Sequence, residues 1–183
     1  MSIYITSDWH FNHNKPFIYE ARGFISVEEM NKNLIINHNA LVDKDDDVFV
    51  LGDLMLGGAD RLEEGIELIQ KMNGKLHIIK GNHDTDKRCV AYAQMWPKVI
   101  EIKNADYLNY GNYHFYLSHY PAATSNYDND KPLKQRLICL CGHTHTNDKW
   151  QDIQIGSYHC EVDAHWNFPV LLDDLIEDLK LYY

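Results

Sequence analysis

The chain of 183 residues is 45% hydrophobic and 12% aromatic, so it can bury a sizeable core and is not a disordered polymer. Its 17 basic and 27 acidic residues give a net charge of −10, which excludes a broad basic groove and avid binding to duplex nucleic acid. No apolar stretch approaches the ~20 residues that cross a membrane. We therefore expect a single domain over residues 1–183 with no membrane contact.

Strands and helices alternate in the first half of the chain. Apolar runs predict strands at Ile3–Thr6, Val48–Leu51, Leu76–Ile79 and Val99–Ile102. A capping-box sequence predicts that a first helix begins after Ser26. A second helix is expected from near Asp60 to Gly74, and a third from Asp84 until Pro97 ends it.

The second half consists mainly of strands. They are predicted at Tyr107–Tyr110, His114–Leu117, Leu137–Leu140 and Tyr158–Val162. A last helix is expected from Leu172 to Lys180. Short turns between these strands favour an antiparallel meander. Early βα alternation followed by strands indicates an α/β fold of two packed sheets with helices outside.

The cysteines show no regular spacing and no CxxC pair. They are Cys89, Cys139, Cys141 and Cys160. Cysteines without a disulfide framework are typical of free thiols in a reducing compartment. We therefore expect a cytoplasmic protein.

Five short strings rich in oxygen and imidazole donors carry the chemistry of the sequence. They are Asp8-Trp9-His10, Gly52-Asp53, Gly81-Asn82-His83-Asp84, Ser118-His119 and Gly142-His143-Thr144-His145. Most of them directly follow an apolar run, as loops at strand ends do. Side chains two positions apart on an extended strand point to the same side, so Asp8 and His10 can bind one cation, while His143 and His145 can flank a pair of metal ions. The donors suffice for two adjacent divalent ions.

This ordered set resembles the calcineurin-like metallophosphoesterase superfamily, in particular its small bacterial and phage members. The resemblance implies a four-layer α/β/β/α sandwich of two mixed sheets flanked by helices. It assigns the first metal to Asp8, His10 and His145, the second metal to Asn82, His119 and His143, and the bridge between them to Asp53. Imidazole and carboxylate donors suit Mn, Fe, Zn, Co or Ni, and Mn is our choice because the family often uses it.

The resemblance also implies hydrolysis of a phosphoester by a metal-activated hydroxide. The leaving alkoxide needs a proton, and the resemblance assigns its donation to His83, which lies beside ligand Asn82 but is not itself a ligand. Asp84 either orients His83 or caps the following helix, and we favour the cap.

Residues 11–24, between the first strand and the first helix, are the candidate substrate loop. His13, Asn14 and Arg22 either contact the substrate or belong to a loop whose aromatic side chains pack on the core. Tyr120 follows ligand His119 and is expected to border the pocket.

The preferred activity is that of a phosphodiesterase acting on small or nucleotide phosphodiesters. The chain lacks the Asp-Arg-Gly string of the Ser/Thr protein phosphatases in this superfamily, and it is too short and acidic for the repair nucleases. One alternative is a phosphomonoesterase acting on a small metabolite. Another is a non-catalytic protein that binds metal or nucleotide on the same fold. The sequence leaves the oligomeric state open.

Overall fold

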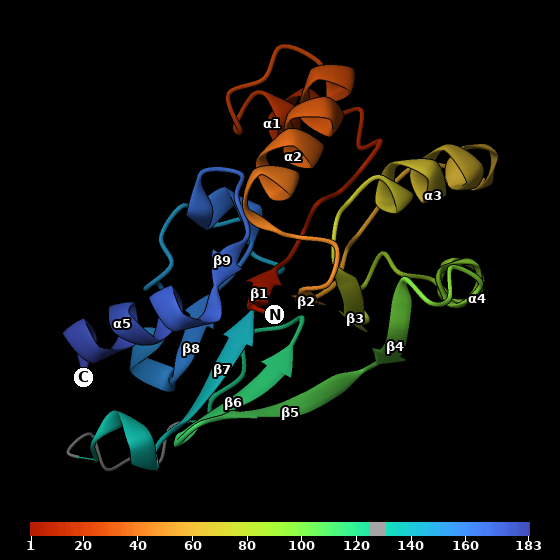
Figure 1. Cartoon of the computed structure of the whole chain (residues 1–183). Coiled ribbons are helices and arrows are strands. Elements are labelled where there is room, and N and C mark those ends of the chain that lie inside the picture. The colour runs from red at the N-terminus through yellow and green to blue at the C-terminus, as the bar shows by residue number, and fades with distance from the viewer. Residues whose placement is uncertain (125–130) are drawn as a thin grey trace.

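The computed structural model describes residues 1–124 and 131–183 and contains two β-sheets with helices around them (Figure 1). The first sheet has five strands in the order β4-β3-β2-β1-β9. They are β1 (Ile3–Thr6), β2 (Asp47–Val50), β3 (Lys75–Ile79), β4 (Val99–Lys103) and β9 (Val170–Leu171). Strands β1 to β4 are parallel and the short β9 is antiparallel to β1, so the sheet is mixed.

The second sheet has four strands in the order β5-β6-β7-β8. They are β5 (Ala105–Tyr110), β6 (Tyr113–Ser118), β7 (Leu137–Cys141) and β8 (Ser157–His159). Strands β5 and β6 form an antiparallel hairpin, but β7 is parallel to β6 and β8 is parallel to β7. The predicted antiparallel meander is therefore wrong beyond the first hairpin. The physical reason is the length of the later connections, which are crossovers and not tight turns.

Helices flank both sheets, which confirms the predicted fold class. They are α1 (Pro16–Tyr19), α2 (Val27–Leu41), α3 (Leu62–Gln70), α4 (Asp86–Ala93) and α5 (Leu172–Tyr182). Helix α1 lies within the predicted substrate loop and was not foreseen. Ser26 caps α2 as predicted, because its side chain accepts a hydrogen bond from the Glu29 amide. Among the described residues, no helix combines the length and the apolar character that a membrane span needs.

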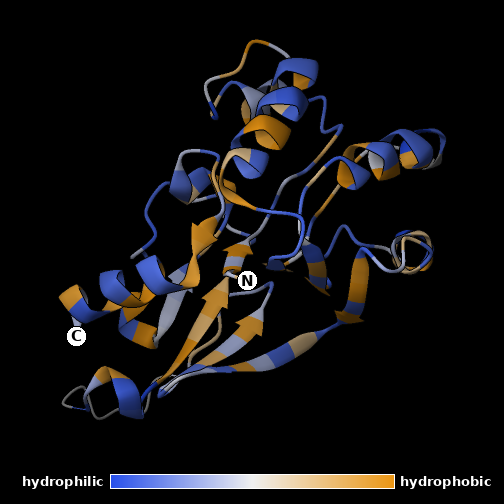
Figure 2. Ribbon diagram, viewed as in Figure 1, coloured by the Kyte–Doolittle hydropathy of each residue, from blue (hydrophilic) through white to orange (hydrophobic). Residues whose placement is uncertain are grey.

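Two hydrophobic cores hold these layers together. In β2 and the residue after it, Val48 and Val50 belong to the core beneath the helices, whereas Phe49 and Leu51 belong to the core between the sheets. Successive side chains point to opposite faces of a strand, so a strand buried on both faces has a continuous apolar sequence. Figure 2 shows this contrast between the hydrophobic inner strands and the helices, which carry hydrophilic residues on their outer sides.

The parallel strands bring their carboxyl ends to one edge of the molecule. The loops that follow β1 and β2 are joined there by a hydrogen bond from the Asp8 amide to the Gly52 carbonyl, at 3.0 Å. The loops that follow β6 and β7 are joined by a bond from the Gly142 amide to the His119 carbonyl, also at 3.0 Å. The His143 amide donates to the Asp8 carboxylate at 2.9 Å, so the edges of the two sheets meet.

Candidate metal centre

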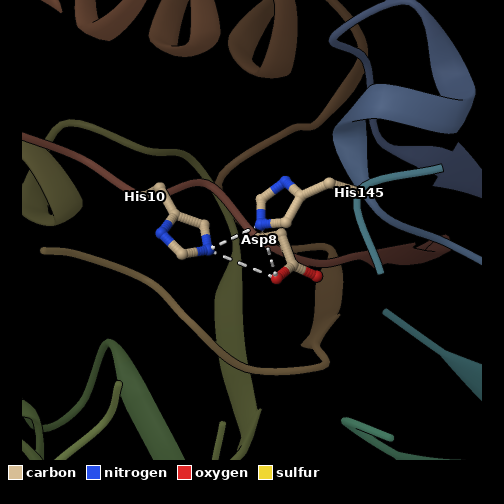
Figure 3. A group of neighbouring side chains, drawn as sticks. All are labelled: Asp8, His10 and His145. Atoms are coloured by element: carbon tan, nitrogen blue, oxygen red, sulfur yellow. Dashed lines mark hydrogen bonds and ion pairs between the residues drawn. The ribbon is translucent and has the colours of Figure 1, made fainter. Parts of the chain in front are cut away.

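The structure brings all seven predicted ligands together in the loops at this edge. Asp8, His10 and His145 form a first cluster, in which the Nε2 atoms of His10 and His145 are 3.2 Å apart (Figure 3). The Asp8 Oδ1 atom lies 3.4 Å from the first of these nitrogens and 3.8 Å from the second. One carboxylate oxygen and two imidazole nitrogens therefore converge on a single point.

A second cluster lies beside the first. The Asn82 Oδ1 atom is 2.8 Å from His119 Nε2 and 2.9 Å from His143 Nδ1, and these two nitrogens are 3.2 Å apart. Asp53 lies between the clusters, with its Oδ2 atom 3.4 Å from His10 Nε2 and 3.6 Å from His119 Nε2. A carboxylate in this position can bind a cation in each cluster.

These distances fit two divalent cations. Ligand atoms at about 2.0–2.2 Å from one ion are necessarily about 3–4 Å from one another, as they are in both clusters. The donors are imidazole nitrogens, carboxylates and one amide oxygen, a set that suits Mn, Fe, Zn, Co and Ni. No cysteine takes part in either cluster among the described residues.

The site combines buried acids with buried imidazoles. Burial lowers the pKa of His10, but its hydrogen bonds and charge interactions with Asp53 and Asp8 outweigh this effect and raise the pKa to about 9. Burial raises the pKa of the Asp8 and Asp53 carboxyls, but the neighbouring histidines more than offset it and lower both. A cation that binds here must displace the proton of His10, so metal uptake and proton release are coupled.

Comparison with known proteins agrees with this geometry. The family model for calcineurin-like phosphoesterases matches residues 1–180. The chain belongs to this family. It is 37% identical over 147 residues to the uncharacterized protein MJ1445 of Methanocaldococcus jannaschii, a match that covers 79% of this chain and 70% of the relative. It is 28% identical over 193 residues to the Gene 66 protein of Mycobacterium phage L5, over 95% of this chain and 92% of that protein.

The fold of this calcineurin-like phosphoesterase is also that of a solved structure of unknown function. The AQ665 protein of Aquifex aeolicus superposes with a TM-score of 0.70 at 20% identity, covering 96% of this chain and 98% of that one. At this identity the likeness shows the fold alone.

Backbone strain is concentrated at the ligands. Five residues of the site have positive φ angles without being glycine: Asp8 (57°), His10 (49°), Asp53 (55°), His143 (79°) and His145 (53°). Each such residue costs of order 1–3 kcal/mol and persists only where its surroundings fix it. The calcineurin-like phosphoesterase fold thus holds its donors in place before any metal arrives.

Protein groups on the far side of each ring fix the orientation of two ligand histidines. The Nδ1 atom of His119 is 2.8 Å from the Leu51 carbonyl oxygen, and that of His145 is 3.0 Å from Asp163 Oδ2. Both Nδ1 atoms act as donors in these contacts, which leaves Nε2 free to bind a cation. Sequence reasoning missed Asp163, because nothing next to it in the chain distinguishes it from neighbouring acidic residues such as Glu161.

Arg22 is buried beneath the metal centre, and its predicted contact with substrate is wrong. Its guanidinium makes a two-pronged ion pair with Asp163, at 2.9 and 2.8 Å. It also donates to the carbonyls of Asp8, at 2.7 Å, and Trp9, at 3.0 Å. Only 1% of the side chain is exposed, and each guanidinium nitrogen already donates to a protein group, so the guanidinium is not free to bind a substrate phosphate. Arg22 instead ties the loop after β1 to the segment that orients His145.

We expect Asp163→Asn to weaken manganese binding by about 10- to 100-fold, because the amide no longer orients and polarises His145 with a full negative charge. Calorimetric titration of the metal-stripped variant with Mn²⁺ measures this. Asp174→Asn, which changes an exposed carboxylate at the start of α5, is the matched control. The Tm of each metal-free protein separates a weaker site from general destabilisation, and unchanged affinity in Asp163→Asn contradicts the assignment.

Asp84 accepts hydrogen bonds from backbone amides of two loops and does not cap α4, so the predicted helix cap is wrong. Thr85 caps α4, with its hydroxyl accepting from the Arg88 amide. The buried Asp84 carboxylate instead accepts from the amides of Asp53, at 2.7 Å, and Gly81, at 3.0 Å, and from the Tyr92 hydroxyl, at 3.0 Å. It therefore joins the loops after β2 and β3. No hydrogen bond from Asp84 to the His83 ring is present among the described contacts.

Arg88 gathers backbone acceptors from the same two loops. Its guanidinium donates to the carbonyls of His83, Met55 (3.0 Å) and Gly57 (2.7 Å). The His83 amide donates to Asp53 Oδ1 at 2.8 Å. The backbone of His83 is therefore held on both sides, whereas its ring is 42% exposed and lies with Nε2 3.9 Å from Asp53 Oδ2. Burial lowers the pKa of this imidazole.

Glu161 supports the loop between His143 and His145. The buried carboxylate accepts from the Thr144 hydroxyl at 3.0 Å and from the Thr146 amide at 3.2 Å. His159, also buried, lies 3.1 Å from the same carboxylate oxygen. Sequence reasoning gave Glu161 no role, because the contact depends on how the segment after β8 folds back on this loop.

The remaining predicted substrate residues lie around the rim of the metal centre. The His13 ring is 5.3 Å from the His10 ring, and burial lowers its pKa to about 4. Asn14 is exposed next to it. Tyr120, with 49% of its surface exposed, packs its ring 4.7 Å from that of His143. Their positions allow contact with a substrate, and this contact remains a prediction.

Proposed function

We propose that this calcineurin-like phosphoesterase uses two divalent cations, with manganese as the resident metal, to hydrolyse small or nucleotide phosphodiesters. Asp8, His10 and His145 would hold one ion, and Asn82, His119 and His143 the other. When bound, the ions supply Lewis acidity, which lowers the pKa of water and neutralises charge on phosphoryl oxygens. We place the protein in the cytoplasm, since its free cysteines suit a reducing compartment.

The position of His83 carries the proposal. Its ring is exposed to solvent beside Asp53, while its backbone is held by Asp53 and Arg88. A leaving alkoxide at the metal centre needs a proton, and an imidazole within reach of that oxygen can donate it. A protein that only binds metal or nucleotide has no need of such a group.

The arrangement of charges favours a diester over a monoester. A monoester dianion gains most from a free guanidinium beside the metals. The two arginines next to the ligands, Arg22 and Arg88, are both engaged by carboxylate or carbonyl groups of the protein. A diester carries one negative charge fewer and needs less compensation.

The test compares bis(p-nitrophenyl) phosphate with p-nitrophenyl phosphate, using protein stripped of metal and reloaded with Mn²⁺. We expect turnover that depends on manganese and is at least tenfold faster on the diester. Preference for the monoester supports the phosphomonoesterase instead. No turnover of either ester with two ions bound per chain contradicts the proposal and supports a non-catalytic binding protein.

A further inference from the structure

A cavity of about 370 Å³ lies beside the metal centre, next to His145. Its wall includes Arg22 and Asp163, and the Asp163 carboxylate is 3.0 Å from the His145 ring. The cavity therefore shares a wall with the first metal cluster. In Figure 3, the blue ribbon next to His145 is the C-terminal part of the chain, to which Asp163 belongs.

An exposed indole stands at this cavity. Trp166, which follows the 3₁₀-helix at Val162–His165, is 89% exposed and lines the cavity. Exposing such a large aromatic surface to water is unfavourable, so an exposed tryptophan is often a binding residue. Trp166 does not lie at a chain terminus, since it stands between this 3₁₀-helix and β9.

The backbone that presents this indole is strained. Trp166 and its neighbour Asn167 have φ angles of +56° and +66°, and two successive non-glycine residues in this region are unusual. The Asn167 amide donates to the Val162 carbonyl at 2.8 Å, and its side chain donates to the Arg22 carbonyl at 3.2 Å. Strain of this kind persists at ligand clamps because the surrounding structure fixes it.

The cavity wall matches an uncharged, planar, hydrogen-bonding group. Arg22 and Asp163 neutralise each other, while Asn147, which is exposed, adds a carboxamide to the lining. An exposed indole beside a carboxamide and a neutral ion pair suits a heteroaromatic ring, which stacks on the indole face and exchanges hydrogen bonds at its edge. The cavity adjoins the metal centre, because Asp163 lines the cavity and contacts His145. A ring bound in the cavity can therefore belong to the same molecule as a phosphoester at the metal centre.

We propose that this cavity is a subsite for the base of a nucleotide phosphodiester, with Trp166 as its stacking platform. The inference rests on the proposed phosphodiesterase activity and specifies its substrate class. A protein partner or a second copy of the chain that covers Trp166 would instead make it an interface residue.

The test compares two diesters that share the p-nitrophenyl leaving group, namely the p-nitrophenyl ester of thymidine 5′-phosphate and methyl p-nitrophenyl phosphate. We expect Trp166→Ala to raise KM for the thymidine ester about tenfold or more, with kcat within twofold. The methyl ester, which has no base, should be hydrolysed as by wild type. Trp166→Phe should recover most of the loss, and Trp96→Ala, at a tryptophan that is 68% exposed elsewhere, is the matched control.

Equal effects of Trp166→Ala on both esters, or no effect on either, overturn the subsite. If the wild type hydrolyses neither ester, the proposed function fails, and the subsite is then tested by the binding of thymidine. Thymidine alone should then quench the tryptophan fluorescence of metal-free wild type and Trp96→Ala in a saturable manner, but not that of Trp166→Phe. Equal quenching in all three proteins overturns the proposal.

Discussion

Asp53→Asn is expected to lose at least about 10³-fold in kcat/KM and to bind fewer than two metal ions per chain. Asp53 Oδ2 lies close to an imidazole nitrogen of each cluster, at 3.4 Å from His10 and 3.6 Å from His119. An amide offers one oxygen and carries no negative charge. The repulsion between two cations in the neighbouring clusters would then be less well neutralised. The other carboxylate oxygen accepts a hydrogen bond from the His83 amide, so the substitution also weakens the hold on the loop that carries His83.

Metal content by mass spectrometry and hydrolysis rates, measured on the same preparation, test this prediction. Asp45→Asn is the matched control, because Asp45 is an exposed carboxylate just before β2. Far-ultraviolet circular dichroism verifies that each variant is folded. An Asp53→Asn protein with two metals and a normal rate would show that the bridge lies elsewhere.

The gathering of the seven donors could be predicted because most of the donor strings follow directly on a recognisable strand, and the family resemblance assigned these donors to two ions. Asp8, Asp53 and Asn82 come after the parallel strands β1, β2 and β3, whose carboxyl ends must meet at one edge. His119 and His143 follow β6 and β7, which are also parallel. Local chain order was therefore enough to place the donors, even though the expected meander had the wrong strand directions.

The groups that orient the ligands could not be predicted in this way. Arg22 and Asp163 are separated by 141 positions, and their ion pair exists only because the segment after β8 returns to the loop after β1. The strain at His10 and His145 likewise comes from packing between loops and not from their own sequences. In the sequence, Arg22 resembles a residue that contacts substrate, because nothing near it reveals its buried partner Asp163.

Asp84 illustrates the same limit over a shorter range. An acidic residue just before a helix is typical of an N-cap, but Thr85 takes that role one position later. Asp84 is then free to bind backbone amides across β2 and β3, at Asp53 and Gly81. Which of two adjacent capping residues is used depends on where the helix begins, and sequence patterns determine helix boundaries least well.

His83→Ala is expected to keep both metals and to lose about 10²- to 10⁴-fold in turnover of diesters with alkyl leaving groups. The ring is not a member of either metal cluster, and its Nε2 atom is 3.9 Å from the nearest oxygen of Asp53. The loss should depend on the leaving group. An alkoxide needs a proton as it departs, whereas p-nitrophenolate is stable as an anion and needs little help.

Metal content and rates with a p-nitrophenyl diester and an alkyl diester distinguish the general acid from a structural role. The alkyl diester should lose far more activity in His83→Ala than the p-nitrophenyl diester, with metal content unchanged. His114→Ala, at an exposed histidine on β6 away from the metal centre, should behave as wild type. A uniform loss on both substrates, or loss of metal, would mean that His83 supports the site and does not donate the proton. Since Arg88 and Asp53 fix the backbone of His83 independently of its ring, removal of the imidazole should leave the loop in place and isolate the proton transfer.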